Sequence, residues 1–250
     1  MATSLALMCS QRDNDLESLS PNVARRSLLR SVSAAALRFG HLPRSQVAET
    51  KAPPKSQNAL SPNSALQRLM EGNDRYVEGK MKPHDFIGER SSLALGQNPF
   101  AVIVGCSDSR VGPEIVFDQG LGDLFVVRTA GEVVDEAALG SIEYAVENLG
   151  STLILVLGHE RCGAVSAAVV GGKARGHIAA VLKAIEPAVK QARGKPGDPI
   201  ENTVRAQAVE VARHLQSAKP ILVERVRSGQ LKIVAARYDL DTGKVELLSI

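Results

Sequence analysis

The chain has 250 residues, of which 44% are hydrophobic and 23% charged, and these values describe one globular domain with a sizeable core. The formal net charge of +3 is small, and part of the arginine excess lies in the first fifty residues, so we expect no nucleic-acid partner. No apolar run approaches the roughly 20 residues that span a bilayer, so we also expect no stable membrane insertion.

Residues 1–60 are rich in Ser, Arg, Ala and Pro and lack a sustained helical or strand period. We therefore predict a disordered or targeting segment there, followed by an ordered domain over residues 61–250. Arg25 and Arg26, followed by the apolar residues 31–37, resemble a twin-arginine export signal and predict a periplasmic or secreted protein. A cytoplasmic protein with a basic tail, or an organellar transit peptide, stays open because Arg38 cuts the apolar run short.

The ordered part is predicted to begin with an amphipathic helix from Ser64 to Tyr76, with Ser61 or Ser64 as its cap. Short β-branched runs then alternate with stretches of helical period. Strands are predicted at 100–104, 124–127, 152–157 and 231–235, and helices at 135–148, 178–193 and 203–216. The order β-α-β indicates an α/β fold with a mainly parallel central sheet and flanking helices. A turn at 238–244 should return residues 245–248 as an antiparallel edge strand.

Cysteine and histidine side chains follow two of these predicted strands. Cys106 comes after the first strand, and His159 and Cys162 come after the third. Because binding and catalytic sites of parallel sheets lie at the carboxyl ends of the strands, we expect the three side chains to meet around one ion. Two thiolates and one imidazole are three ligands for Zn²⁺, and a vacant fourth position is typical of a catalytic zinc that lowers the pKa of bound water to about 7. The sequence thus predicts a zinc hydrolase or hydratase with one Zn²⁺ per subunit.

The motifs Cys-x-Asp-Ser-Arg at 106–110 and His-x-x-Cys at 159–162 resemble those of β-class carbonic anhydrases. The resemblance covers about residues 61–250 and extends through four further segments: 113–114, 118–120, 122–128 and 140–145. It implies a lyase that reversibly hydrates carbon dioxide to bicarbonate and a proton by attack of zinc-bound hydroxide. It also implies that Cys106, His159 and Cys162 bind the zinc.

By the same resemblance, Asp108 and Arg110 form the catalytic dyad of the family. A carboxylate close to the metal can accept a hydrogen bond from zinc-bound hydroxide and orient it towards carbon dioxide. Arg110 is expected to keep Asp108 ionised and away from the metal, since a nearby opposite charge lowers the pKa of an acid. If the pair broke, Asp108 could become a fourth ligand and close the site.

The resemblance also assigns five residues to the substrate pocket. Gln97 is expected to donate a hydrogen bond to substrate, Phe125 and Tyr144 match the apolar walls, and Ala130 lies in the same pocket where the family often carries valine. The backbone at Gly163 opens a helix whose N–H groups favour an anion.

Relatives with a regulatory bicarbonate site carry a tryptophan where this chain has Ile103, and the chain contains no tryptophan. We therefore predict an open resting site. Arg128, which matches an arginine of that regulatory site, is interpreted as a structural ion-pair or dimer-contact residue. Glu132 stands where many relatives have asparagine, and an extra carboxylate near the cleft is expected either to raise the pKa values of neighbouring acids or to alter dimer contacts.

Two other functions stay open on sequence grounds. Relatives with the same metal ligands hydrolyse carbon disulfide or carbonyl sulfide, and a zinc-binding sensor module without turnover is a second alternative. The resemblance further implies a homodimer or homotetramer, with the helix at residues 61–76 either laid across a partner or folded back on its own subunit.

Overall fold

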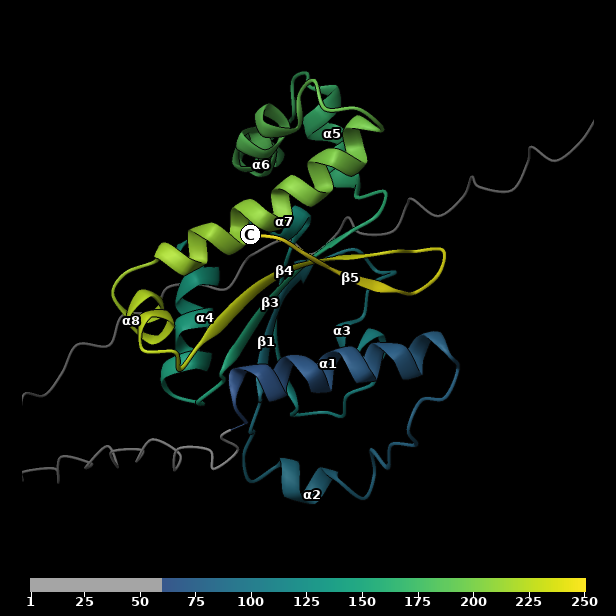
Figure 1. Cartoon of the computed structure of the whole chain (residues 1–250), viewed down its shortest axis with the longest axis vertical. Helices are drawn as coiled ribbons and strands as arrows, with labels where there is room; N and C mark the ends of the chain where they lie inside the picture. The colour runs from purple at the N-terminus through teal and green to yellow at the C-terminus, as the bar shows by residue number, and fades with distance from the viewer. Residues whose placement is uncertain (1–59) are drawn as a thin grey trace, which may run out of the picture. The chain divides into compact units, whose positions relative to one another are not determined.

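The computed structural model describes residues 60–250, so the predicted targeting segment lies outside the described residues except for Leu60 (Figure 1). Within that range the chain forms one five-stranded sheet in the order β2-β1-β3-β4-β5. The strands are β1 Ala101–Cys106, β2 Leu124–Thr129, β3 Leu153–His159, β4 Lys232–Tyr238 and β5 Val245–Leu248. The first four are mutually parallel and β5 is antiparallel to β4. The predicted α/β fold with an antiparallel edge strand is thus confirmed.

Helices cover both faces of the sheet and extend beyond it. They are α1 Pro62–Val77, α2 Arg90–Leu93, α3 Pro113–Val116, α4 Glu136–Glu147, α5 Gly163–Val170, α6 Ile178–Ala192, α7 Pro199–Ser217 and α8 Ile221–Arg227, with a 3-10 turn, η1, at Ala130–Glu132. The predicted helix at 203–216 begins four residues early, because Pro199 suits a first helical turn and the Asp198 side chain accepts from the N–H of Ile200. Among the described helices, none combines the length and apolar character that crossing a bilayer requires.

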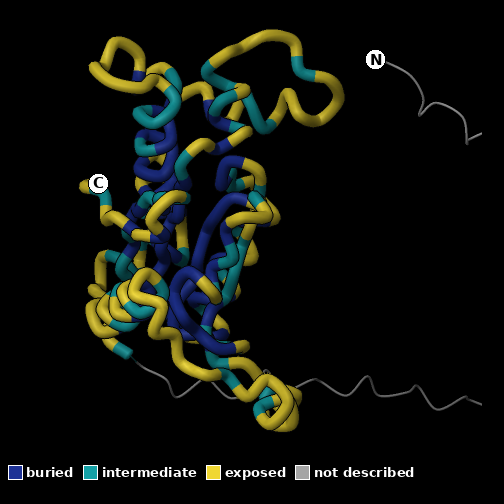
Figure 2. Tube along the Cα trace, turned by 90° about the vertical axis from the view of Figure 1, so that its right-hand side faces the viewer, coloured by how far each residue is buried: buried dark blue, intermediate teal, exposed yellow. Residues whose placement is uncertain are grey.

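The two strands β1 and β3 are buried along their whole length. Figure 2 shows buried segments, in dark blue, running through the middle of the molecule. The side chains of the two strands alternate between the two faces of the sheet. Val102 and Ile154 belong to the core under α4, α7 and α8, whereas Ile103 and Leu155 belong to the core under α1. A sheet buried on both faces explains why these runs are continuously apolar instead of alternating.

Helix α1 folds back onto its own subunit. Its amino end is capped by Ser61, whose Oγ accepts from the N–H of Ser64 at 3.1 Å, and Leu69 is fully buried in the core beside Phe117. The buried Asn73 side chain joins the helix to the final hairpin: Nδ2 donates to the Gly243 carbonyl at 2.9 Å and Oδ1 accepts from the N–H of Val245 at 2.8 Å. The Leu69 face of α1 is therefore covered within the subunit.

Candidate metal centre

The three predicted metal ligands meet at one end of the sheet. Cys106 is the last residue of β1, His159 is the last residue of β3, and Cys162 is the residue that precedes α5. Because β1 and β3 are parallel neighbours, their carboxyl ends lie side by side. The two sulfurs are 3.9 Å apart, and the ligand atoms of all three buried residues lie within 4.8 Å of one another. The predicted convergence of the two motifs is confirmed.

The His159 ring is oriented for metal binding. Its Nδ1 lies 2.9 Å from the carbonyl oxygen of Glu160, which can only accept, so Nδ1 carries the proton and Nε2 has a free lone pair. Nε2 is buried without a hydrogen-bond partner. An orphaned buried acceptor is costly unless something else satisfies it, and a metal ion between this nitrogen and the two sulfurs does so. Two sulfurs and one imidazole nitrogen fit a zinc ion.

The local backbone favours a thiolate at Cys106. Its Sγ accepts from the N–H of Gly131 at 3.3 Å and lies next to the thiol of Cys162. Hydrogen bonding from Cys162, supported by Gly131, lowers the pKa of Cys106 to about 4 despite burial. The same contact with the Cys106 thiolate raises the pKa of Cys162. In the metal-free pair, one sulfur is thus prepared to ionise ahead of the other.

Gly131 makes this contact possible, and no motif in the sequence predicted it. Its φ of 65° lies in the left-handed region, where side chains are disfavoured. A Cβ at this position would approach Ile185 Cδ1 to 2.7 Å. The conformation and the crowding together require glycine.

Asp108 and Arg110 form a bidentate pair at the rim of the metal group. The Nε and Nη2 of Arg110 donate to the two carboxylate oxygens of Asp108 at 2.9 and 2.7 Å. These hydrogen bonds hold the pKa of Asp108 below its usual range. Oδ2 of Asp108 lies 3.8 Å from Nε2 of His159, too far for a hydrogen bond but close to the metal group. The carboxylate is therefore ionised and held beside the Cys106, His159 and Cys162 group.

Arg128 holds the backbone of the same loop. Its Nε donates to the Cys106 carbonyl at 2.9 Å and its Nη2 donates to the Asp108 carbonyl at 2.6 Å. Arg128, interpreted from the sequence as a structural ion-pair or dimer-contact residue, thus has a structural role within the subunit through two backbone carbonyls. The sequence did not reveal this role of Arg128, because its guanidinium binds backbone carbonyls. Every residue has a backbone carbonyl, so no particular partner side chain appears in a motif.

Glu132 lies inside the protein and not at the surface of a cleft. It is 1% exposed, and both carboxylate oxygens are buried without a hydrogen-bond partner. Desolvation, reinforced by the charge of Cys106, raises the pKa of Glu132 well above its ordinary value. The predicted influence on a neighbouring acid is present, because the charge of Glu132 contributes to the raised pKa of Cys162, and Glu132 itself also titrates abnormally.

The predicted pocket residues fall into two groups. Ala130 begins η1 and Gly163 begins α5, so both lie next to the metal ligands. Phe125 instead pairs with Val102, four residues before the register position of Cys106, or about 13 Å along the strand.

Gln97 precedes β1 and is exposed at the amino end of the sheet, opposite to the metal group, and Tyr144 on α4 is 44% exposed. One subunit therefore does not bring Gln97 and Phe125 to the metal group. A motif match carries no information about which subunit supplies a residue.

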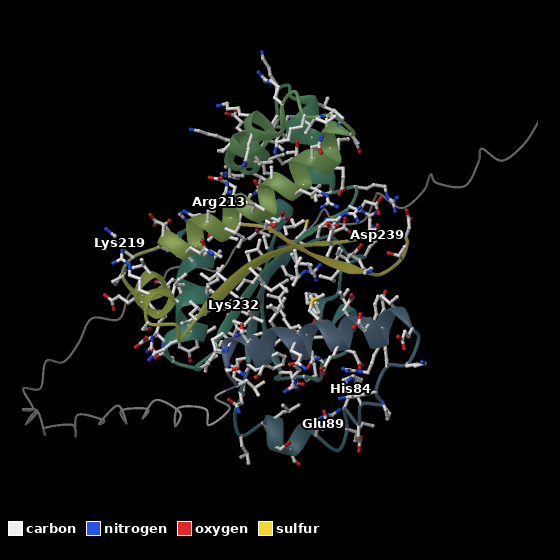
Figure 3. All side chains as sticks on the ribbon, viewed as in Figure 1. His84, Glu89, Arg213, Lys219, Lys232 and Asp239 are labelled. Atoms are coloured by element: carbon white, nitrogen blue, oxygen red, sulfur yellow. The ribbon has the colours of Figure 1, made fainter. Side chains whose placement is uncertain are left out.

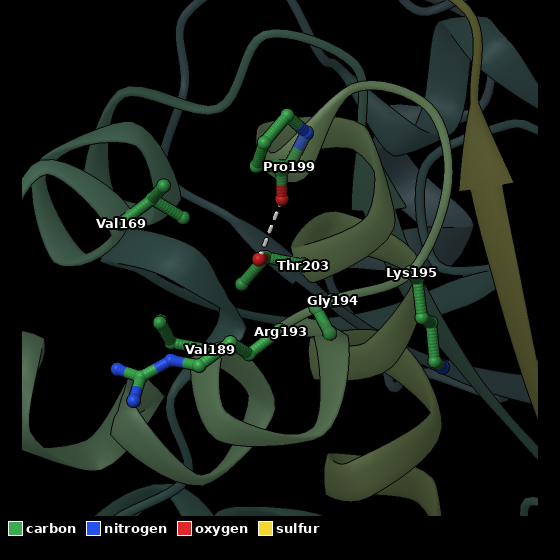
Figure 4. Close-up of a pocket in the computed structure, with 8 residues that line it drawn as sticks. Val169, Val189, Arg193, Gly194, Lys195, Pro199 and Thr203 are labelled. Atoms are coloured by element: carbon green, nitrogen blue, oxygen red, sulfur yellow. Dashed lines mark hydrogen bonds between the residues drawn. The ribbon is translucent and has the colours of Figure 1, made fainter.

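A pocket of about 220 Å³ lies elsewhere, between the ends of α5 and α6 and the start of α7 (Figure 4). Val169, Val189 and Thr203 are among its lining residues, and none of the predicted site residues is. The Thr203 hydroxyl already donates to the Pro199 carbonyl at 2.7 Å. This pocket offers no group for the predicted chemistry.

Known proteins resemble this chain in both sequence and structure. The family model described as carbonic anhydrase matches residues 101–245. Carbonic anhydrase 2 of Mycobacterium tuberculosis is 44% identical over 192 residues, which are 75% of this chain and 93% of that protein. The carbonic anhydrase of Mycolicibacterium smegmatis is 43% identical over 195 residues, covering 76% and 94%.

Among solved structures, the β-carbonic anhydrase CcaA has a TM-score of 0.60 at 27% identity, covering 74% of this chain and 95% of its own. The Coccomyxa β-carbonic anhydrase, solved with acetazolamide, has a TM-score of 0.61 at 27% identity, covering 73% and 86%.

The parallel sheet with a Cys, His, Cys group at its carboxyl edge defines an α/β protein with three side chains that could hold one metal ion. With the relatives above, the chain belongs to the β-class of the carbonic anhydrase family, and its reaction is the hydration of carbon dioxide. The comparisons do not support the alternatives of a carbon disulfide or carbonyl sulfide hydrolase or a silent sensor module.

Proposed function

We propose that this carbonic anhydrase uses one Zn²⁺ per subunit, bound by Cys106, His159 and Cys162, to interconvert carbon dioxide and bicarbonate. The observation that carries the proposal is the buried, unpartnered Nε2 of His159, which lies in a group with two sulfurs. Zinc with three protein ligands supplies a strong nucleophile, since it lowers the pKa of a bound water to about 7.

The catalytic role that we propose for Asp108 is orientation of the nucleophile. An ionised carboxylate accepts hydrogen bonds and cannot donate them, so it fixes the direction of a proton on the attacking oxygen. Arg110 supports this role in two ways, because its bidentate contact keeps Asp108 ionised and occupies the carboxylate oxygens. The pairing also supports the predicted open resting site, since a carboxylate held by Arg110 is not free to act as a fourth ligand.

The substrate pocket is proposed to be completed by a second subunit. Ala130 and Gly163 supply its near wall from the subunit that holds the metal. Gln97, Phe125 and Tyr144 lie at the amino end of the sheet or on exposed surface, where a partner in a homodimer or homotetramer could present them to the neighbouring metal group. Exposed apolar side chains in the segment before Gln97, such as Ile87 and Leu95, support a covered surface there.

Stopped-flow carbon dioxide hydration with zinc-loaded protein tests the activity. We expect the wild type to be much faster than buffer and Asp108→Asn, which keeps the shape of the side chain but removes its charge, to lose most of the rate. A wild type no faster than buffer at about pH 7 to 9, where zinc-bound water is ionised, contradicts the proposal. Metal content measured on the same samples separates loss of zinc from loss of the carboxylate.

For the compartment, we propose export through the twin-arginine route. The proposal rests on Arg25 and Arg26 and the apolar residues that follow them. A route that carries folded proteins allows thiolate ligands to bind zinc before they meet an oxidising compartment. Cell fractionation of the wild type and an Arg25→Lys, Arg26→Lys variant tests it, and a wild type retained in the cytoplasm contradicts it.

A further inference from the structure

The two residues between the metal ligands His159 and Cys162 are held by a turn from the far end of the chain. Arg161 has a φ of 52°, in the left-handed region that non-glycine residues rarely adopt. Its guanidinium makes a bidentate pair with Asp241, with Nη2 to Oδ1 at 2.7 Å and Nη1 to Oδ2 at 2.9 Å. Asp241 lies in the turn between β4 and β5, 80 positions away in the sequence.

The turn that carries Asp241 is itself rigidly built. Asp239, labelled in Figure 3, accepts at Oδ1 from the N–H groups of Asp241 and Thr242 at 3.1 and 2.8 Å and from the Thr242 hydroxyl at 2.9 Å. Its other oxygen pairs with Nη1 of Arg237 at 2.7 Å. A turn fixed by this many hydrogen bonds presents the Asp241 carboxylate in one position.

A second set of contacts joins the turn to Glu160. The Glu160 N–H donates to the Tyr238 carbonyl at 2.9 Å, and its side chain accepts from the N–H of Leu240 at 3.2 Å. The Glu160 carbonyl in turn is the acceptor that orients the His159 ring. Glu160, Asp239 and Asp241 lie close together, and each faces Arg161 or Arg237, so the group is an ion-pair network.

Residues 159–162, which we call the metal-ligand loop, also contact the pair formed by Asp108 and Arg110. The carbonyl of Arg161 lies 3.4 Å from Nη2 of Arg110, the same nitrogen that donates to Asp108 at 2.7 Å. The direction of this carbonyl follows from the left-handed conformation of Arg161. If Arg161 relaxed, Arg110 would lose its second acceptor and Asp108 would be held less firmly, with the metal group within reach of its carboxylate.

We propose that Asp241 is a positioning residue of this carbonic anhydrase: through its bidentate pair with Arg161 it holds the metal-ligand loop and keeps Arg110 on Asp108. The inference rests on the proposed zinc site and dyad. It makes the β4–β5 turn, which touches neither metal nor substrate, a part of the catalytic apparatus. Residues that orient metal ligands from outside the ligand sphere commonly affect affinity or activity about 10- to 100-fold.

A purely structural interpretation predicts something different. Arg161 and Asp241 are 51% and 69% exposed, and exposed ion pairs add little to stability. A surface pair without a positioning role would leave both zinc binding and the pH profile unchanged. The chain offers a comparison in Arg205 and Glu246, a bidentate pair at 2.9 and 2.7 Å with side chains 36% and 52% exposed, which is linked to Glu160 only indirectly, through Glu201 and Arg237.

The test compares zinc-loaded Asp241→Asn, Arg161→Lys and Asp241→Glu with wild type and Glu246→Gln. Zinc release to a chromogenic chelator, the pH profile of kcat/KM and thermal unfolding are measured for each. We expect Asp241→Asn and Arg161→Lys to release zinc about 10-fold faster and to require a higher pH for half-maximal kcat/KM. The higher pH follows because a freed Asp108 competes with hydroxide for the vacant position. Asp241→Glu, which keeps the carboxylate, should stay closest to wild type.

Equal zinc release and equal pH profiles for Asp241→Asn and Glu246→Gln would overturn the positioning role. The positioning role would also be overturned if faster zinc release from Asp241→Asn were fully accounted for by its lower thermal stability, with no change in the pH profile. If the wild type itself does not hydrate carbon dioxide, the proposed function fails, but the zinc-release comparison still decides the role of Asp241.

Discussion

The N–H of Gly131 donates to the sulfur of Cys106 across 3.3 Å, from a backbone conformation that only glycine adopts easily. We expect Gly131→Ala to lower the free energy of unfolding by about 2 kcal/mol or more, because the new methyl group combines a left-handed φ with a collision at Ile185. The affinity of the Gly131→Ala variant for zinc should fall as well. Gly140→Ala, in an open position within α4, is the control and should be neutral or stabilising in denaturant unfolding. Equal stability of the two variants would contradict this prediction.

Arg128→Lys should reduce kcat/KM by roughly 10- to 100-fold while leaving the fold intact. Lysine keeps the charge but cannot donate along two fixed directions to the carbonyls of Cys106 and Asp108. Steady-state hydration kinetics at matched zinc content measure the effect. Arg213→Lys, on the exposed face of α7, is the control, and a rate for Arg128→Lys equal to that of the control would show that the backbone contact is dispensable.

Glu132 should make the protein less stable as pH rises. Its pKa in the folded protein is raised, so the unfolded chain releases the proton at a lower pH than the folded chain does. The stability is therefore fully present below the ordinary carboxyl pKa and declines as pH rises from there towards the raised folded pKa. Glu132→Gln removes this contribution, so the difference in stability between variant and wild type should grow in favour of the variant with pH.

Urea unfolding of zinc-loaded wild type, Glu132→Gln and Glu210→Gln at several pH values measures this difference. Glu210 is exposed on α7, so its replacement should leave the pH dependence of wild type unchanged. A constant offset between Glu132→Gln and wild type at all pH values would contradict abnormal titration of Glu132.

Zinc should protect two thiols from alkylation. With metal bound, the sulfurs of Cys106 and Cys162 are ligands and are not free nucleophiles. After chelation we expect Cys106 to react first, since its pKa is lowered to about 4 while that of Cys162 is raised. Peptide mass spectrometry after brief iodoacetamide treatment reads each site. His159→Asn should lose the protection, and reaction at Cys162 ahead of Cys106 would contradict the assigned order.

Local sequence predicted those parts of the fold that depend on periodicity. The apolar runs of β1 and β3 are buried on both faces, so their composition alone identifies them. Their ends were less predictable: β1 and β3 run to Cys106 and His159, two residues past the predicted ends, because ladder pairing with neighbours extends them. The grouping of the three metal ligands could also be predicted, since the carboxyl ends of neighbouring parallel strands lie at the same edge of a sheet.

Contacts between segments that are distant in the chain could not be predicted from local sequence. Nothing near Asp241 indicates that it pairs with Arg161, and nothing near Arg128 indicates that it binds two carbonyls of the preceding strand end. Phe125 was placed in the pocket by its motif, but its position on β2 separates it from Cys106 within one subunit. Each of these facts depends on tertiary register, which short motifs do not encode.

The link between Asn73 and Val245 spans 172 positions in the chain. Chains emerge from the ribosome with the amino end first and fold as they emerge. Helix α1 is therefore made early and can first contact nearby residues, through the Asn73 side-chain bond to the Val116 carbonyl, but its hydrogen bonds to Gly243 and Val245 form only after that hairpin has left the ribosome. The Asn73 side chain therefore obtains its full set of hydrogen bonds only after residue 245 has been made, long after α1 itself.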